Sequence, residues 1–210
     1  MNKMNRLTKG LVNSIAALTL VIFHAQAIAG VEQEKPSVIN ISDDTFTCMR
    51  DMTKVDGFYV GNLLGDVAAT VKVAQSASGG VYPTGSVIQL VPSEVMVKHH
   101  TGFSPVTNDW EFFELDVSPQ GSKIINRGFA DVINRFGGNC LDCHVKAEPQ
   151  WDMVCKTGHG CEPIPLSKQE LALLQKTDPR CKDNVKLTDD EVKILIQLEK
   201  STAALLANKN

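Results

Sequence analysis

The stretch SVIQLVPSEVMVKHH, residues 86–100, contains two apolar, valine-rich runs on either side of Pro92 and Ser93. β-Branched residues favour strands, whereas proline and serine favour a turn. The stretch therefore predicts a strand over 86–91, a turn, and an antiparallel strand over 95–99.

Further strand and helix patterns flank this pair. On its N-terminal side, residues 58–61 predict a short strand, and apolar residues at helical spacing predict a helix over about 64–75. On its C-terminal side, the aromatic run WEFFELDV (110–117) predicts a strand, and the turn-forming SPQGS leads to a short strand over 123–125. The strands from residue 86 onward predict an antiparallel meander of about four strands, and residues 58–61 add a separate short strand.

Two capping boxes, each a hydroxyl residue followed three positions later by glutamate, begin at Ser167 and Thr188. This pattern is typical of helix N-termini. It predicts helices that run to about Lys176 and about Ala207. We therefore expect an α+β fold in which residues 166–210 form a helical C-terminal extension.

The first 29 residues have the three parts of a secretory signal peptide. Three cations without anions come first, then the apolar run Leu11–Phe23, and then two A-x-A sites suited to cleavage. The apolar run is shorter than the ~20 residues that cross a bilayer. We expect residues 1–29 to be removed on export to the periplasm, leaving a polar arm over 30–44 and no membrane span.

The charge of the chain bears on its partners. Removing the three cations of the signal peptide lowers the net charge from -3 to -6. The remaining chain has no cluster of lysine and arginine of the kind that binds nucleic acid. The sequence therefore favours small molecules or other proteins as partners and excludes nucleic acid.

The segment GGNCLDCHVKAEPQWDMVC, residues 137–155, places Cys140, Cys143 and His144 in the order C-x-x-C-H. Covalent haem needs two thiols that reach the two vinyl groups and an imidazole that binds the iron. A thiol–disulfide oxidoreductase motif would instead lie between a strand and a helix of a βαβ unit. Behind a signal peptide, the motif favours one covalently attached haem c, with thioether links at both cysteines and His144 as the proximal iron ligand.

Four further cysteines lie in the part of the chain that we expect to be exported: Cys48, Cys155, Cys161 and Cys181. An even number in an oxidising compartment is consistent with two disulfides, for which three pairings exist. The glycine-containing loop KTGHG favours Cys155 with Cys161, which leaves Cys48 with Cys181. A zinc site made by Cys140, Cys143, Cys155 and Cys161 is the competing interpretation.

Three segments of the chain resemble the cytochrome P-460 family: YPTGSVIQL (82–90), WEFF (110–113) and CLDCHVKAEPQWDMV (140–154). That family includes the hydroxylamine-oxidising cytochromes P-460 and the NO-binding cytochromes c′-beta. The resemblance covers roughly residues 55–155. It implies that residues 45–165 form a haem-binding domain with an antiparallel sheet against the haem, followed by the disulfide-tied helical tail.

The resemblance also implies roles for single residues. The haem ligands of the family match Cys140, Cys143 and His144, and its distal carboxylate matches Glu94. In P-460 proteins a lysine is bonded covalently to the haem rim, and the matching position here is Leu90. Because leucine cannot form that bond, binding, sensing or detoxification of nitrogen oxides is at least as well favoured as hydroxylamine oxidation.

These patterns predict a periplasmic mono-haem c protein with an open distal site for NO or hydroxylamine. A periplasmic redox protein is expected to exchange electrons with its haem. A homodimer is compatible with the sequence. The alternative is an electron-transfer cytochrome with six-coordinate iron, and a haem-free, disulfide-bonded binding module is a third class.

Several other side chains have simpler structural explanations. Met96 and Met153 could be sixth ligands, although methionine in such places more often fills the core. His99 and His100 are expected at the surface or in hydrogen bonds, and His159 is expected to be exposed. The aromatic residues of the 110–117 strand are expected in the core: Trp110, Phe112 and Phe113.

Overall fold

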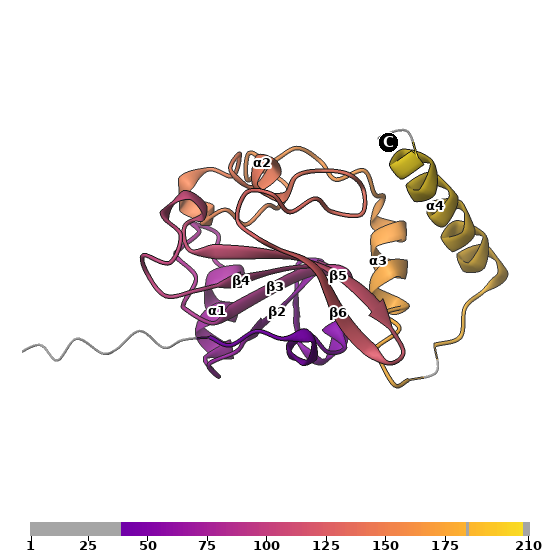
Figure 1. The fold of residues 1–210 in the computed structure, drawn as a ribbon, viewed down its shortest axis with the longest axis horizontal. Coiled ribbons are helices and arrows are strands. Elements are labelled where there is room, and N and C mark those ends of the chain that lie inside the picture. Colours follow the sequence, from indigo (N-terminus) through magenta and orange to yellow (C-terminus); the bar gives the residue numbers. More distant parts are fainter. Residues whose placement is uncertain (1–38, 184, 208–210) are drawn as a thin grey trace, which may run out of the picture. The chain divides into compact units, whose positions relative to one another are not determined.

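An antiparallel sheet of six strands, each paired with its neighbours in sequence, forms the centre of the computed structural model (Figure 1). The structure describes residues 39–183 and 185–207. The strands are β1 (Thr53–Val55), β2 (Phe58–Asn62), β3 (Ser86–Val91), β4 (Glu94–Lys98), β5 (Trp110–Ser118) and β6 (Gly121–Gly128). The predicted α+β class and antiparallel meander are confirmed. The predicted signal peptide and residues 30–38 of the predicted polar arm lie outside the described residues.

The sheet adds β1 and β2 to the predicted meander of about four strands: β2 confirms the short strand predicted over 58–61, whereas β1 was not predicted. β1 is only three residues long, and it forms a hairpin with β2 through Asp56 and Gly57, both at positive φ. An Asp-Gly pair between strands is a strong hairpin signal, so this strand could have been predicted from the sequence.

Helix α1 (Val67–Ala74) lies in the connection between β2 and β3. Its N-cap is Asp66, whose side chain accepts a hydrogen bond from the Ala69 amide at 3.1 Å. The predicted start at residue 64 was too early, because Asn62 turns the chain by accepting from the Leu64 amide and Gly65 adopts φ +92°.

The two faces of the sheet bury two separate cores. Across four strands, Val60, Ile88, Met96 and Phe112 lie side by side on one face. Leu90, Cys140 and Leu141 pack against this core, which also contains Trp110 and Met153. The opposite face buries a second set of residues: Ile41, Phe46, Val87, Val95, Val97, Phe113 and Leu115.

The predicted core aromatics are confirmed on both faces of the sheet. Trp110, Phe112 and Phe113 are each exposed by 2 % or less. Burial of a side chain of this size stabilises the fold by roughly 1.5–3 kcal/mol. These three residues therefore fix how β5 sits between the two cores.

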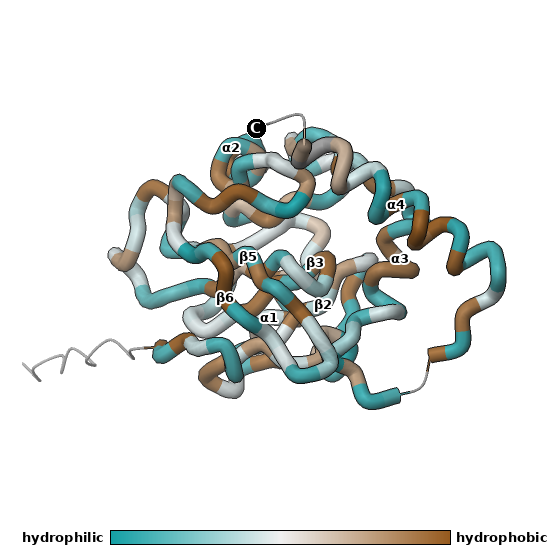
Figure 2. The backbone as a smooth tube through the Cα atoms, turned by 45° about the vertical axis from the view of Figure 1, so that its right-hand side comes forward, coloured by the Kyte–Doolittle hydropathy of each residue, from teal (hydrophilic) through white to brown (hydrophobic). Residues whose placement is uncertain are grey.

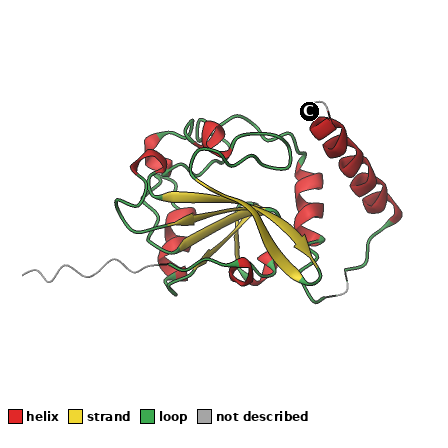
Figure 3. Ribbon diagram, in the orientation of Figure 1, coloured by secondary structure: helices red, strands yellow, loops and turns green. Residues whose placement is uncertain are grey.

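Helices of different lengths accompany the sheet (Figure 3). After β6 come α2 (Cys140–His144), α3 (Lys168–Lys176) and α4 (Asp189–Ala207). The 3-10 turns η1 (Asp43–Thr45) and η2 (Met49–Asp51) precede β1, η3 (Pro105–Thr107) lies between β4 and β5, and η4 (Pro149–Trp151) follows α2. Both capping boxes are formed as predicted, at Ser167 and at Thr188. α3 contacts both β3 and α4, and α4 carries hydrophilic and hydrophobic residues along its length (Figure 2).

Two disulfides join Cys48 to Cys181 and Cys155 to Cys161. The favoured pairing is therefore confirmed, and the four-cysteine zinc site is wrong, because two of its sulfurs are bonded to each other. No helix among residues 39–183 and 185–207 is long and apolar enough to cross a membrane.

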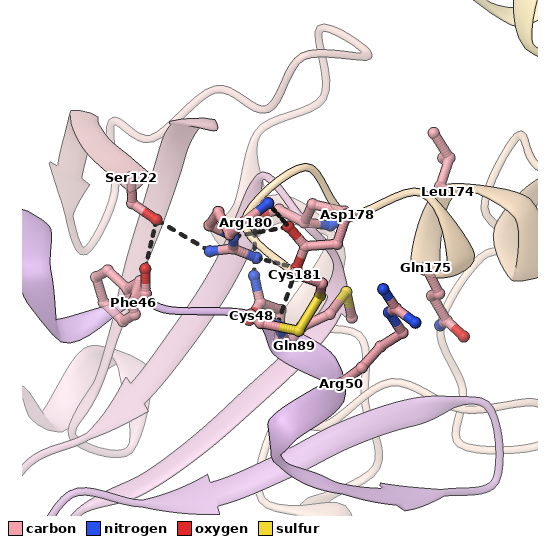
Figure 4. A network of polar contacts seen from close by, with 12 residues as sticks. Phe46, Cys48, Arg50, Gln89, Ser122, Leu174, Gln175, Asp178, Arg180 and Cys181 are labelled. Atoms are coloured by element: carbon pink, nitrogen blue, oxygen red, sulfur yellow. Dashed lines mark hydrogen bonds and ion pairs between the residues drawn. A yellow bond between two sulfur atoms is a disulfide. The ribbon is translucent and has the colours of Figure 1, made fainter. Parts of the chain in front are cut away.

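A buried polar network surrounds the Cys48–Cys181 disulfide and fastens the C-terminal extension to the sheet (Figure 4). Arg180 donates to Asp178 and to Ser122 Oγ, and Asp178 Oδ2 also accepts from the Met49 amide at 2.9 Å. Gln175 of α3 donates to the carbonyl oxygens of Gly57 and Leu90. The extension thus holds the β3 bulge at Leu90, beside the C-x-x-C-H motif in the same core.

Candidate haem site

Helix α2 carries the whole C-x-x-C-H motif and is fixed at its N-terminus. Asn139 is the N-cap: its Oδ1 accepts from the Asp142 amide at 3.1 Å, while its Nδ2 donates to the Ala130 carbonyl at 2.6 Å. The Cys140 amide donates to Val132 O. Because residues four apart share a face of a helix, Cys140 and His144 lie on the same side of α2.

That side of α2 is turned to the sheet. Cys140 packs against the core that contains Met96 and Phe112, and the ring of His144 lies 5.1 Å from the ring of Phe112, centroid to centroid. The predicted haem ligands and strands β4 and β5 are therefore brought together.

The orientation of His144 is set by a backbone carbonyl. Its Nδ1 lies 2.7 Å from Met153 O, and a carbonyl oxygen can only accept, so Nδ1 carries the proton. Burial lowers the pKa of His144, against the opposing effect of this hydrogen bond, and so favours the neutral ring. A neutral imidazole with Nδ1–H bonded to a carbonyl presents the Nε2 lone pair, as metal-binding histidines do.

Cys140 and Cys143 are the two cysteines left free by the disulfides, since all six lie in the described part of the chain. Burial raises the pKa of Cys140 to about 12, and the charges of Glu94 and Glu114 act in the same direction. Cysteines that exchange disulfides have lowered pKa values. The environment of Cys140 therefore disfavours the oxidoreductase interpretation of the motif.

Two carboxyl groups lie on the sheet face that α2 covers. Glu94 on β4 is directly opposite Glu114 on β5, and each shares its face with the residue two positions along its strand, Met96 or Phe112. Glu94 Oε1 and Glu114 Oε2 are buried without a hydrogen-bond partner. Arg135 approaches Glu114 Oε1 at 3.6 Å. Glu94 is thus half-buried beneath the motif and is not a solvent-exposed surface carboxylate.

Burial raises both carboxyl pKa values. Burial and then repulsion from Glu114 raise the pKa of Glu94 to about 8, although Arg135 acts in the opposite direction. Burial raises the pKa of Glu114 to about 7, again against Arg135. The pair therefore retains at least one proton near neutral pH, because two adjacent buried carboxylates repel each other.

The other histidines do not join Cys140 and His144. His99 is buried as a hydrogen-bonded residue: its Nε2 lies 2.8 Å from Glu111 Oε2, and its ring stacks on Phe103. Glu111 precedes Phe112 on β5, so this contact lies on the opposite face of the sheet. His100 is bonded through Nδ1 to Thr101 O.

The prediction that His159 is exposed was wrong. The disulfide loop folds back, so that His159 is 7 % exposed, stacks on Trp151 at 3.7 Å, and bonds through Nδ1 to Val154 O at 2.7 Å. Met96 and Met153 are both buried in the core beneath α2, where they act as packing.

Sequence reasoning missed Glu114, Arg135 and the Met153 carbonyl. The alternation in WEFFELDV indicates that residues 110, 112 and 114 share a face, so Glu114 could have been placed beside Phe112. Its pairing with Glu94 depends on strand register, which local pattern does not give.

One other cluster in the described part of the chain contains metal-ligating residue types: Cys48, Asp178 and Cys181. Both sulfurs are in a disulfide, and the Asp178 carboxylate is bonded to Arg180 and to the Met49 amide. These contacts leave no thiolate to bind a metal.

Helix α2 fits a covalent haem because it carries two free thiols and an imidazole whose Nε2 has no proton. The facing sheet adds carboxyl oxygens without a hydrogen-bond partner. Comparison of the chain with family models, curated proteins and solved structures found no match. The resemblance to the cytochrome P-460 family therefore rests on the residue pattern alone.

Proposed function

We propose that this chain is an exported mono-haem c-type cytochrome, similar to the cytochrome P-460 family, that handles small nitrogen oxides. The observation that carries the proposal is a pair of free thiols on one short helix with an imidazole whose Nδ1 is bonded to a backbone carbonyl. Cys140 and Cys143 would hold the haem, and His144 would bind its iron through Nε2. When bound, the haem would supply an iron that coordinates NO or hydroxylamine and exchanges electrons.

The chain's own contribution to such chemistry is proton transfer. Glu94 and Glu114 face the motif with unpartnered oxygens, and their raised pKa values lie near neutral pH. General acids and bases work best when their pKa is close to the working pH. In the proposed site, Glu94 Oε1 accepts or returns the proton of a bound N–H or O–H group, and Glu114 shares it.

The residue that would form the cross-link of hydroxylamine-oxidising P-460 proteins is replaced in this chain. Leu90 occupies the matching position, on the β3 bulge. Lys98, the nearest lysine in sequence, is engaged elsewhere: its Nζ bonds both carboxylate oxygens of Asp152 at 2.8 Å. We therefore favour ligand binding, sensing or detoxification over hydroxylamine turnover.

An electron-transfer cytochrome is the second candidate, because Met96 lies beside Phe112, whose ring contacts His144. The absorption spectrum of the reduced holoprotein with and without CO distinguishes the two. An open site shifts its spectrum on addition of CO, and Met96→Leu leaves that shift unchanged. A spectrum that ignores CO in the wild type and responds in Met96→Leu would overturn the open-site proposal in favour of a six-coordinate carrier.

A further inference from the structure

A buried ion pair lies behind the turn that orients His144. Lys98 at the end of β4 and Asp152 after η4 are exposed by only 5 % and 3 %. Lys98 Nζ lies 2.8 Å from both carboxylate oxygens of Asp152 and donates a further hydrogen bond, at 2.6 Å, to Asn108 O. All three donors of the ammonium are therefore used inside the protein.

Two further hydrogen bonds hold Asp152. Its Oδ2 accepts from the Tyr82 amide at 2.9 Å, and its backbone carbonyl accepts from Trp110 Nε1 at 2.8 Å. The rings of Tyr82 and Trp110 meet edge to face, and Lys98 Nζ lies over the Trp110 ring. Asp152 is thus fixed at both its side chain and its main chain.

The backbone at this point has an unusual conformation. Asp152 and Met153 adopt φ values of +48° and +64° in succession. Residues with a β-carbon rarely occupy this left-handed region, and they remain in it only where their surroundings enforce it. The consequence is that the Met153 carbonyl points at Nδ1 of His144, at 2.7 Å.

We propose that the Lys98–Asp152 ion pair is a positioning device for the proximal imidazole, acting through the Met153 carbonyl. The proposal rests on the proposed function, since it assigns these residues to the haem ligand. The hydrogen bond at Nδ1 fixes the plane and tautomer of the ring and makes Nε2 a stronger donor. A buried ion pair contributes little net stability, whereas a role in orienting His144 accounts for its place here.

The pair is tested by removing its charges in the holoprotein. The variants are Lys98→Met with Asp152→Asn, and the single change Asp152→Asn, in which the amide oxygen still accepts from Tyr82. Without the Lys98–Asp152 ion pair the Met153 carbonyl can turn away from Nδ1, and Nε2 of His144 becomes a weaker electron donor to the iron. Weaker donation destabilises ferric iron more than ferrous iron. If the preference of the site for ferric over ferrous haem falls about tenfold, as metal affinity does when other outer-shell partners are removed, the midpoint potential rises by about 59 mV.

The matched control is Asp178→Asn. Asp178 forms an equally buried ion pair with Arg180, but in the network around the Cys48–Cys181 disulfide. The control should lower the melting temperature and leave the potential unchanged.

Each outcome decides a separate claim. A raised midpoint potential in either variant of the Lys98–Asp152 pair, with an unchanged midpoint potential in Asp178→Asn, supports the positioning role. A Lys98–Asp152 variant whose holoprotein has a lower melting temperature yet keeps its midpoint potential overturns the positioning role. So does a failure of the single and double variants to attach haem while circular dichroism shows them folded and NMR spectra show Nδ1 of His144 still protonated. A wild-type chain that attaches no haem instead overturns the proposed function.

Discussion

Glu94 and Glu114 are the residues whose chemistry depends most on where the fold places them. They stand opposite each other on β4 and β5, each with one covered oxygen that has no partner. Burial favours the protonated form of both, and repulsion from Glu114 adds to this effect at Glu94, so the pair can hold a proton beside the thiols of α2.

This storage makes the free energy of unfolding depend on pH. The pKa of Glu94 is 4.5 when unperturbed and about 8 in the fold. Its contribution to stability is therefore fully present below about pH 4.5 and is lost as the pH rises through about 8. We expect urea unfolding of the holoprotein to require less urea at pH 8.5 than at pH 5.5, and Glu94→Gln to reduce that difference.

Glu170→Gln is the control for this measurement. Hydrogen bonds from Ser167 lower the pKa of the Glu170 carboxyl, so its contribution changes only below the pH range tested. The same pH dependence in Glu94→Gln as in the wild type would show that Glu94 is ionised throughout.

At the same scale, the residues found from the sequence are those defined by a local pattern. Cys140, Cys143 and His144 are adjacent in one motif, and no folding is needed to associate them. Glu114 and Asp152 were missed because each becomes relevant only through strand register or a turn that brings distant segments together.

At the scale of elements, helix ends and strands were predictable because their signals are local. The capping box at Ser167 begins α3 at the next residue, as expected. β1 was missed because it is short and largely exposed, so it has no clear apolar alternation. The Asp56–Gly57 pair between β1 and β2 was the local signal that could have identified it.

The two disulfides close loops of very different length and should differ in their effect on stability. Cys48 and Cys181 are separated by 133 residues, and Cys155 and Cys161 by six. In the chain-entropy model these loops correspond to about 5 and about 2 kcal/mol of free energy of unfolding. Urea unfolding of Cys48→Ser/Cys181→Ser should show the larger loss. An equal or larger loss in Cys155→Ser/Cys161→Ser would mean that the short loop stabilises the fold through its contacts with α2 rather than through chain entropy.

At the scale of the whole molecule, the C-terminal extension is part of the structure that supports the candidate site. Gln175 donates to the carbonyl of Leu90, and the Cys48–Cys181 disulfide joins the segment after α3 to η2 (Figure 4). The fold class followed from the sequence, because strand and helix periods differ. The docking of α3 on β3 did not follow, because it depends on buried polar contacts between residues more than 80 positions apart.

The central claim is that α2 holds a covalent haem, and the mass of the denatured protein tests it most directly. Protein made together with a cytochrome c maturation system should have the mass of the chain plus one haem, because thioether links survive denaturation. Cys140→Ala/Cys143→Ala should lose that mass, whereas Cys155→Ala/Cys161→Ala should keep it. A wild-type chain without haem, or one with stoichiometric zinc instead, would contradict the claim.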